Sequence, residues 1–143
     1  MIVVDASVWV SRFVRRDVHH EASRQWLAEQ VGSGAAFVGP ALVLAEVAGA
    51  ISRQTGRSRL GGLALGWFNR LPGLRIIPID HRLGAAAADI AARFGLRGAD
   101  AIYVATAHVL ALPLVTWDAE QRERGGRLVA VRTPVDGGST PTG

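Results

Sequence analysis

The sequence predicts an α/β fold built on a mainly parallel central sheet of about five strands. Short apolar runs alternate along the chain with longer segments that have the helical period. The length of 143 residues suits one domain with a buried core and leaves little room for a second. Two of the apolar runs lead directly into acidic residues, which this fold would place at the ends of strands.

The expected elements follow one another in a regular order. The expected strands are 2–5, 36–38, 74–77, 113–116 and 128–131. The expected helices are 8–14, 21–31, 40–53, 58–71, 81–94 and 99–110. Pro40 suits a first helical turn, and Ser58 and Asp80 stand where N-caps belong. From Asp136 onward the residues are small, polar or Pro, so we expect a domain over 1–132 and a flexible tail over 133–143.

The composition excludes several classes of chemistry. The chain has no cysteine, which excludes disulfide frameworks, cysteine-bound zinc and thiol nucleophiles. All 16 basic residues are arginine, so chemistry that depends on lysine is also excluded. The net charge of +4 suits a polyanionic partner such as nucleic acid, although ordinary surface charge explains it equally well. We expect no membrane span and no signal peptide, and therefore a cytoplasmic protein.

Four acidic residues occupy places where solvated surface charges are uncommon. Asp5 ends the first expected strand, and Asp118 follows the fourth. Ligands of open parallel sheets bind beyond the carboxyl ends of the strands, so these two carboxylates are expected to converge there. Asp100 and Glu46 lie on apolar faces of two expected helices.

A convergence of these acids predicts a metal site. Buried like charges repel one another, so such carboxylates either bind protons or hold a cation. Hard oxygen ligands favour Mg²⁺ or Mn²⁺, which can activate water for phosphoryl transfer. Simpler structural roles remain open: Asp5 can cap the following helix, and the helix dipole favours Asp100 at a helix start. Asp89 is expected on the surface, paired with Arg93.

Four segments carrying these acids resemble the PIN-domain ribonucleases, specifically the VapC-type toxins of bacterial toxin–antitoxin pairs. The segments are Val3-Val4-Asp5-Ala6-Ser7-Val8, Ala45-Glu46-Val47, Gly98-Ala99-Asp100-Ala101-Ile102-Tyr103-Val104-Ala105-Thr106-Ala107 and Pro113-Leu114-Val115-Thr116-Trp117-Asp118. The first and third segments together are the specific ones, and the resemblance extends over roughly residues 1–132. All four acidic positions are filled. One departure is that the residues after Asp118 lack the apolar side chain often found there.

The resemblance implies a three-layer α/β/α PIN-like fold and a Mg²⁺- or Mn²⁺-dependent endoribonuclease. By the same resemblance, Asp5, Asp100 and Asp118 hold the metal, and Glu46 completes the catalytic set as a metal-site or water-orienting carboxylate. Ser7 and Thr116 either position these carboxylates or serve only a helix start and a strand end. The implied partners are an RNA substrate, a cognate VapB-type antitoxin and a second copy of the chain in a homodimer.

Three other features have open interpretations. An apolar stripe at helical period is expected in the core or, as a hypothesis, along an antitoxin groove or dimer surface; it consists of Leu60, Leu63, Ala64, Trp67, Phe68 and Leu71. A finding that Trp67 is fully buried would remove the second reading. Arg53, Arg57 and Arg59 either contact substrate phosphates or remain solvated. His19 and His20 are expected on the surface.

The alternative functions are a structure-specific DNA nuclease and a non-catalytic PIN-like binding module. The metal chemistry does not distinguish RNA from DNA, whereas the complete acidic set argues against a binding module. Signalling receiver domains and haloacid-dehalogenase-type phosphatases also carry aspartates at strand ends. Members of both families use a lysine beside those acids, and this chain has no lysine.

Overall fold

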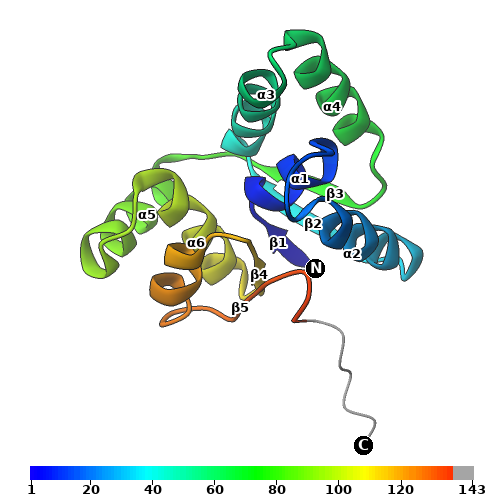
Figure 1. Cartoon of the computed structure of the whole chain (residues 1–143). Helices are drawn as coiled ribbons and strands as arrows, with labels where there is room; N and C mark the ends of the chain where they lie inside the picture. Colours follow the sequence, from blue (N-terminus) through cyan, green and yellow to red (C-terminus); the bar gives the residue numbers. More distant parts are fainter. Residues whose placement is uncertain (137–143) are drawn as a thin grey trace, which may run out of the picture.

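The computed structural model describes residues 1–136, which form one five-stranded, entirely parallel sheet with helices on both sides (Figure 1). The strands are β1 (Ile2–Val4), β2 (Phe37–Pro40), β3 (Leu74–Ile77), β4 (Leu114–Val115) and β5 (Val131–Arg132). The helices are α1 (Ala6–Phe13), α2 (His20–Gly32), α3 (Leu42–Thr55), α4 (Ser58–Arg70), α5 (His81–Phe94) and α6 (Gly98–Leu110), and η1 (Gln121–Gly125) is a π-helical turn.

The spatial order of the strands is β3-β2-β1-β4-β5. The chain therefore builds the sheet outward from β1 in one direction through β2 and β3, and then returns to add β4 and β5 on the other side. Val4 of β1 is in register with Val115 of β4. The boundary between β1 and β4 is thus the point where the direction of strand addition reverses, which is where open α/β sheets bind ligands.

The core consists of apolar side chains pressed onto the two faces of this sheet. On one face, α1 and α2 bring Trp9 and Trp26 against Phe37 of β2, with ring centroids 5.6 and 6.4 Å away. Helix α6 lies beside β1, β2 and β4, and α5 packs against α6. The strands are short, but Val3, Val4, Phe37 and Leu114 are fully or almost fully buried, as strands covered on both faces require.

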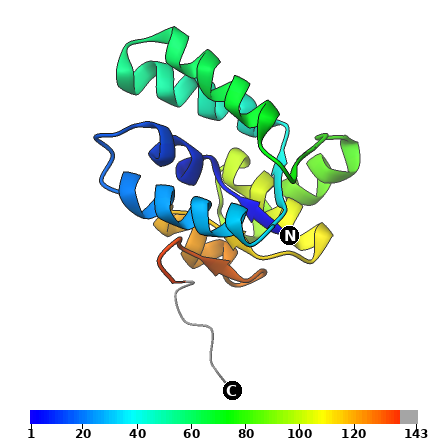
Figure 2. The ribbon, with the colours of Figure 1, turned by 90° about the vertical axis from the view of Figure 1, so that its right-hand side faces the viewer.

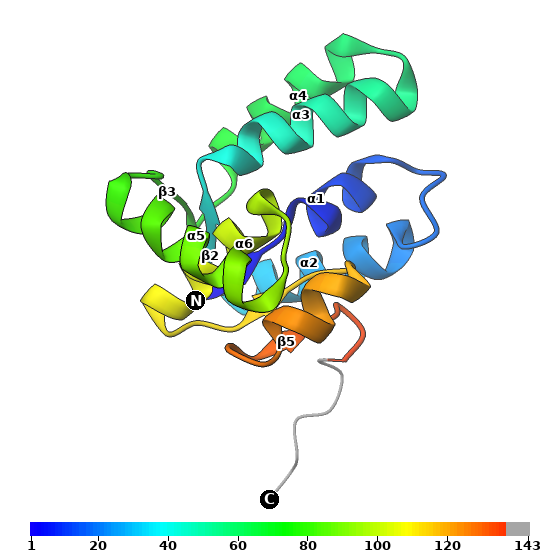
Figure 3. The same ribbon diagram turned by 90° about the vertical axis from the view of Figure 1, so that its left-hand side faces the viewer.

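Helices α3 and α4 form an antiparallel hairpin that extends along one end of the molecule (Figures 2 and 3). The two helices cross closely because Gly61 of α4 lies against the backbone of Ala48: a Cβ at Gly61 would approach the Ala48 carbonyl oxygen to 2.7 Å. The amino-terminal half of α3 starts directly after β2, so Glu46 lies near the carboxyl ends of the strands.

Most expected elements are present, and three details of the prediction are wrong. Pro40 is the last residue of β2, in register with Ile77, rather than part of a helix. The last strand pairs at Val131 and Arg132, later than expected, because Gln121–Gly125 forms a turn that the sequence did not reveal. Ser58 is the first helical residue rather than the N-cap, whereas Asp80 does cap α5, accepting from Leu83 N at 2.9 Å.

The ends and surface of the described chain complete the fold. Within 1–136 no helix is long and apolar enough to cross a membrane. The expected tail over 133–143 lies for the most part outside the described residues; of its beginning, Thr133 is buried and its N–H donates to Asp136 at 2.8 Å. The expected surface pair of Asp89 and Arg93 is present, with a separation of 3.2 Å.

Candidate metal-dependent active site

The site forms where β1 and β4 end side by side. The N–H of Asp5 donates to the Val115 carbonyl at 3.0 Å, so the end of β1 is tied to β4. Asp118 follows β4 by a few residues, in the turn that leads into η1. The sheet therefore brings together two carboxylates that are 113 positions apart in the chain, since 118 − 5 = 113.

Asp5 is both a helix cap and a buried carboxylate facing the other acids. Its side chain accepts from Ser7 N at 2.9 Å as the N-cap of α1, and only 6% of the residue is exposed. Burial raises the pKa of Asp5, and hydrogen bonds from Ser7, Thr116 and Gln121 oppose that rise. The capping role and the site role, which the sequence presented as alternatives, are thus compatible in one residue.

Two hydroxyl groups connect β1 and β4 behind Asp5. The oxygens of Ser7 Oγ and Thr116 Oγ1 are 3.3 Å apart. Ser7 Oγ accepts from Trp117 N at 3.1 Å, and Thr116 Oγ1 accepts from Asp118 N at 3.0 Å. One of the two hydroxyls donates to the other, and both lower the pKa of Asp5. Ser7 and Thr116 therefore hold the backbone before Asp118 and the carboxylate of Asp5 together.

Glu46 reaches the site from α3 and is held by a side chain of α6. The buried hydroxyl of Tyr103 donates to Glu46 Oε1 at 2.7 Å. Burial raises the pKa of the half-buried Glu46, the Tyr103 bond lowers it, and the charge of Asp5 raises it. Burial, together with the charges of Asp5 and Glu46, raises the pKa of the Tyr103 phenol well above its usual range. Tyr103 is thus a neutral donor to a carboxylate.

Asp100 and Asp118 complete the acidic group. Asp100 lies in the first turn of α6 and is half-buried, and Asp118 is exposed. Burial is the largest cause that raises the pKa of Asp100 to about 6, followed by the charges of Asp118, Asp5 and Glu46. Arg97 opposes this effect. The other three acids are therefore near enough for their charges to raise the pKa of Asp100.

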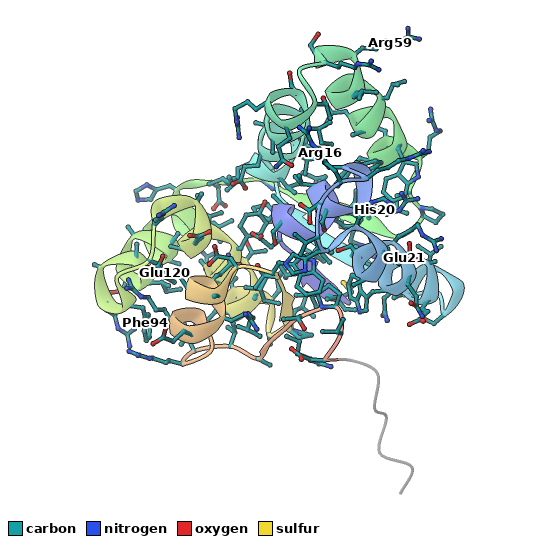
Figure 4. The ribbon with its side chains drawn as sticks, in the orientation of Figure 1. Arg16, His20, Glu21, Arg59, Phe94 and Glu120 are labelled. Carbon is teal, nitrogen blue, oxygen red and sulfur yellow. The ribbon has the colours of Figure 1, made fainter. Side chains whose placement is uncertain are left out.

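These side chains surround one hollow, here called the acidic cavity, of about 340 Å³. Its walls include Asp5, Glu46, Asp100 and Asp118, together with Ser7, Asp17, His19, Arg53, Gln54 and Trp117. Arg53 is the member of the arginine group that reaches this wall. Arg57 instead lines a separate hollow beside Phe13, and Arg59 lies at the far end of the hairpin (Figure 4).

Sequence reasoning missed the ring pair at the rim of the acidic cavity. His19, expected on the surface, is partly buried and stacks on Trp117 with centroids 3.9 Å apart and planes 6° from parallel. Trp117 Nε1 donates to Ser23 Oγ at 2.8 Å, which anchors the indole to α2. The position of Trp117 beside Asp118 was the available signal. The contacts of Tyr103 and Gln121, made across 57 and 21 positions, had no local signal.

The donor set fits a divalent metal ion that retains part of its water shell. Within residues 1–136, no three His, Asp or Glu side chains lie close enough together to hold a metal ion between them. All four acids nevertheless offer hard oxygen donors around one cavity, and their repulsion is relieved by a cation. Mg²⁺ is commonly bound through one or two carboxylates and several waters, so a closed cage is not required.

Comparisons with solved structures give the same fold. VapC20 of Mycobacterium tuberculosis, described as a Sarcin-Ricin loop cleaving toxin, is 20% identical with a TM-score of 0.76, covering 92% of this chain and 99% of that one. FitAcB from Neisseria gonorrhoeae is 23% identical with a TM-score of 0.71, covering 94% and 99%. VapBC2 from Rickettsia felis, bound to a DNA fragment from its promoter, is 14% identical with a TM-score of 0.70, covering 93% and 98%. No curated protein sequence matches the chain.

The family itself is established by sequence. The family model of the PIN domain matches residues 2–126, which is most of the chain and includes all four acids. PIN domain nucleases generally use divalent metal ions. The resemblance read from four short segments is thereby confirmed, and so is the predicted α/β fold with its parallel sheet. This chain belongs to the PIN domain family.

Proposed function

We propose that the protein is a Mg²⁺- or Mn²⁺-dependent endoribonuclease that acts as the toxin of a toxin–antitoxin pair. The observation that carries the proposal is the meeting of Asp5, Glu46, Asp100 and Asp118 around one cavity at the β1–β4 boundary. Four segments contribute these acids, and nothing in the packing of a non-catalytic domain requires them to converge. Their mutual repulsion costs stability in the metal-free protein, which argues for a role in binding a cation.

The proposed division of roles follows the position of each carboxylate. Asp5, Asp100 and Asp118 hold the metal, which when bound lowers the pKa of a water and stabilises charge on the phosphoryl group. Glu46, kept in place by Tyr103, orients the attacking water beside the ion. Arg53 lies on the same wall and attracts a backbone phosphate of the substrate into the cavity. No side-chain nucleophile is needed in this scheme.

RNA is the preferred substrate for two reasons. VapC20, whose fold this chain shares, is a toxin that cleaves the Sarcin-Ricin loop. The rings of His19 and Trp117 stack on each other at the rim of the cavity. Aromatic side chains at such a place favour RNA, because single-stranded RNA is commonly bound through aromatic stacking. A structure-specific DNA nuclease remains the second candidate, because the same ion and carboxylates hydrolyse either sugar-phosphate backbone. An RNA substrate would place the protein in the cytoplasm.

A cognate VapB-type antitoxin and a homodimer are the proposed partners. Several proteins of this fold are toxin–antitoxin complexes, including one from Klebsiella pneumoniae. The apolar stripe of α4 divides between core and surface: Ala64 and Phe68 are buried, whereas Leu63 is 58% exposed. Trp67 is only partly buried and lines a hollow between α2 and α4, so its proposed contribution to a partner surface is retained.

The direct test is cleavage of total bacterial RNA by protein freed of antitoxin, in Mg²⁺ or Mn²⁺. EDTA and Asp5→Asn serve as controls, and light scattering of the same sample compares its mass with the 15.1 kDa of one chain. Discrete fragments that disappear in both controls are the expected result. Folded protein that binds metal and leaves RNA intact while cutting branched or single-stranded DNA would favour the DNA nuclease. Folded protein that cuts neither RNA nor DNA and binds no metal would favour the non-catalytic binding module.

A further inference from the structure

Gln121 is a fully buried polar residue at the start of η1, directly behind the acidic cavity. It occupies the segment after Asp118 in which PIN-type proteins often carry an apolar side chain. Burying an amide without full hydrogen bonding destabilises a fold. Its Oε1 has no hydrogen-bond partner among the described residues. An apolar side chain of the same size would serve packing better, so packing alone does not account for the amide.

The hydrogen bonds of Gln121 all lead to site acids. Its backbone N–H donates to Asp118 Oδ1 at 2.6 Å. Its side-chain Nε2 donates to the backbone carbonyl of Asp100 at 3.3 Å. The Gln121 side chain also lowers the pKa of the Asp5 carboxylate. The backbone of Gln121 therefore contacts Asp118, whereas its side-chain amide ties the first turn of α6 at Asp100 to η1.

The chemistry of an amide suits this place better than that of a cation. An arginine in contact with Asp5 would stabilise its charged form but would also neutralise part of the field that attracts a metal ion. An amide donates a hydrogen bond and carries no charge, so it does not cancel the negative charge of the acidic group. Groups that hold metal-binding carboxylates from behind contribute strongly to metal affinity in other proteins.

We propose that Gln121 is a positioning residue whose side-chain amide holds the first turn of α6, and with it Asp100, beside Asp5 for a divalent cation without neutralising the acids. The inference deepens the proposed function, because the cation is the one that the nuclease would use. A positioning role affects metal affinity and metal-free stability in opposite directions, whereas a merely structural role would change both in the same direction. Gln121 raises metal affinity, whereas its unpartnered oxygen lowers the stability of the metal-free fold.

The test measures Mn²⁺ affinity of the full chain at pH 7, from the free-ion signal in electron paramagnetic resonance, and thermal unfolding without metal. Gln121→Met replaces the amide with an apolar chain of similar length, and Gln121→Leu is a second apolar variant in case the first misfolds. Thr133→Val is the matched control, because it removes a buried hydroxyl that also has no partner among the described residues and lies outside the cavity wall.

The expected result is a loss of Mn²⁺ affinity of about 10-fold or more in both Gln121 variants. Their metal-free melting temperature stays equal to that of the wild type or rises, and Thr133→Val keeps wild-type affinity. If the folded Gln121 variants bind Mn²⁺ with wild-type affinity, the inference about Gln121 is wrong and the proposed function is unaffected. An equal loss in Thr133→Val would also overturn the inference about Gln121, because general loosening would then be the cause. A wild-type protein that binds no Mn²⁺ overturns the proposed metal-dependent function as well.

Discussion

The hydroxyl of Tyr103 donates a 2.7 Å hydrogen bond to Glu46 Oε1, and this bond joins α6 to α3. Tyr103 comes from a helix packed on the sheet, whereas Glu46 comes from the projecting hairpin. The bond therefore fixes the hairpin carboxylate relative to Asp5 and Asp100. It is also a charge-assisted bond with a donor that does not itself ionise, because the pKa of Tyr103 is strongly raised.

Removing this hydroxyl with Tyr103→Phe is expected to lower the free energy of unfolding at pH 7 by about 1–3 kcal/mol. The bond lowers the pKa of Glu46, so its stabilisation is largest where Glu46 is charged and decreases as pH falls. Urea unfolding at pH 7 and pH 4 measures the difference. The loss should be smaller at pH 4. An equal loss at both values would mean that the substitution disturbs packing and not the carboxylate. Glu46→Gln, which keeps an acceptor, is the control.

Asp5→Asn and Asp5→Ala are expected to separate the capping role of Asp5 from its charge. Both variants remove the carboxylate and should abolish cleavage. Asparagine keeps an oxygen that accepts from Ser7 N, whereas alanine loses the cap at a cost of about 1 kcal/mol. In the folded protein the pKa of Asp5 is raised, so its ionisation opposes folding at pH 7, and Asp5→Asn should melt at or above the wild-type temperature without metal. Thermal unfolding in EDTA measures both. An Asn variant that is less stable than the wild type would contradict the prediction, because the charge of Asp5 would then stabilise the metal-free fold.

The raised pKa of Asp100 predicts how the metal-free protein responds to pH. Its folded value of about 6 exceeds the ordinary 3.8, so between these values the folded state binds a proton that the unfolded state releases. Stability from this group is therefore lost as pH rises from about 4 to 6, and the penalty remains above 6. Asp100→Asn should match the wild type near pH 4 and exceed its stability at pH 7. Thermal unfolding across that range in EDTA measures this, and parallel curves would contradict it.

The same ionisation predicts that metal binding weakens in acid. A divalent ion requires charged carboxylates, so Mn²⁺ binding below pH 6 must displace a proton from Asp100. We expect the apparent affinity to fall as pH decreases from 7 to 5, with proton release on binding in that range. Calorimetry in two buffers of different ionisation enthalpy measures the released proton. Affinity that is constant over this range would place Asp100 outside the metal site.

Two adjacent glycines of α4 are expected to respond in opposite directions to the same substitution. In Gly61→Ala the new Cβ meets the Ala48 carbonyl oxygen at 2.7 Å, so the hairpin must separate, at a cost of about 1–3 kcal/mol. Gly62 has open space at its Cβ position, and Gly62→Ala should stabilise the helix by about 0.5–1 kcal/mol. Urea unfolding of both variants compares them directly. A neutral Gly61→Ala would show that α3 and α4 shift freely, and the position of Glu46 would then not depend on this contact.

The amino-acid sequence was sufficient to predict the order of the elements and to identify the four acids. Periodicity is a local property, so the helices and most strands could be located from it, and Asp5 and Asp118 could be assigned to strand ends. The apolar neighbours of Glu46 and Asp100 were sufficient to separate them from surface charges such as Asp89. The errors lie at the ends of elements, as at Pro40, where pairing with β3 extended β2 into the expected helix, and after Asp118, where the η1 turn was not expected and the last strand begins later.

Which of these residues lie close together depends on the tertiary structure. The order β3-β2-β1-β4-β5 makes β1 and β4 neighbours, and no local pattern specifies that order. The bond from Tyr103 to Glu46, the bond from Gln121 to Asp100 and the stacking of His19 on Trp117 all join segments that are distant in the chain. Such contacts depend on the packing of whole helices against the sheet, a property of the assembled core, whereas the pattern of apolar residues records only which side of each element faces inward.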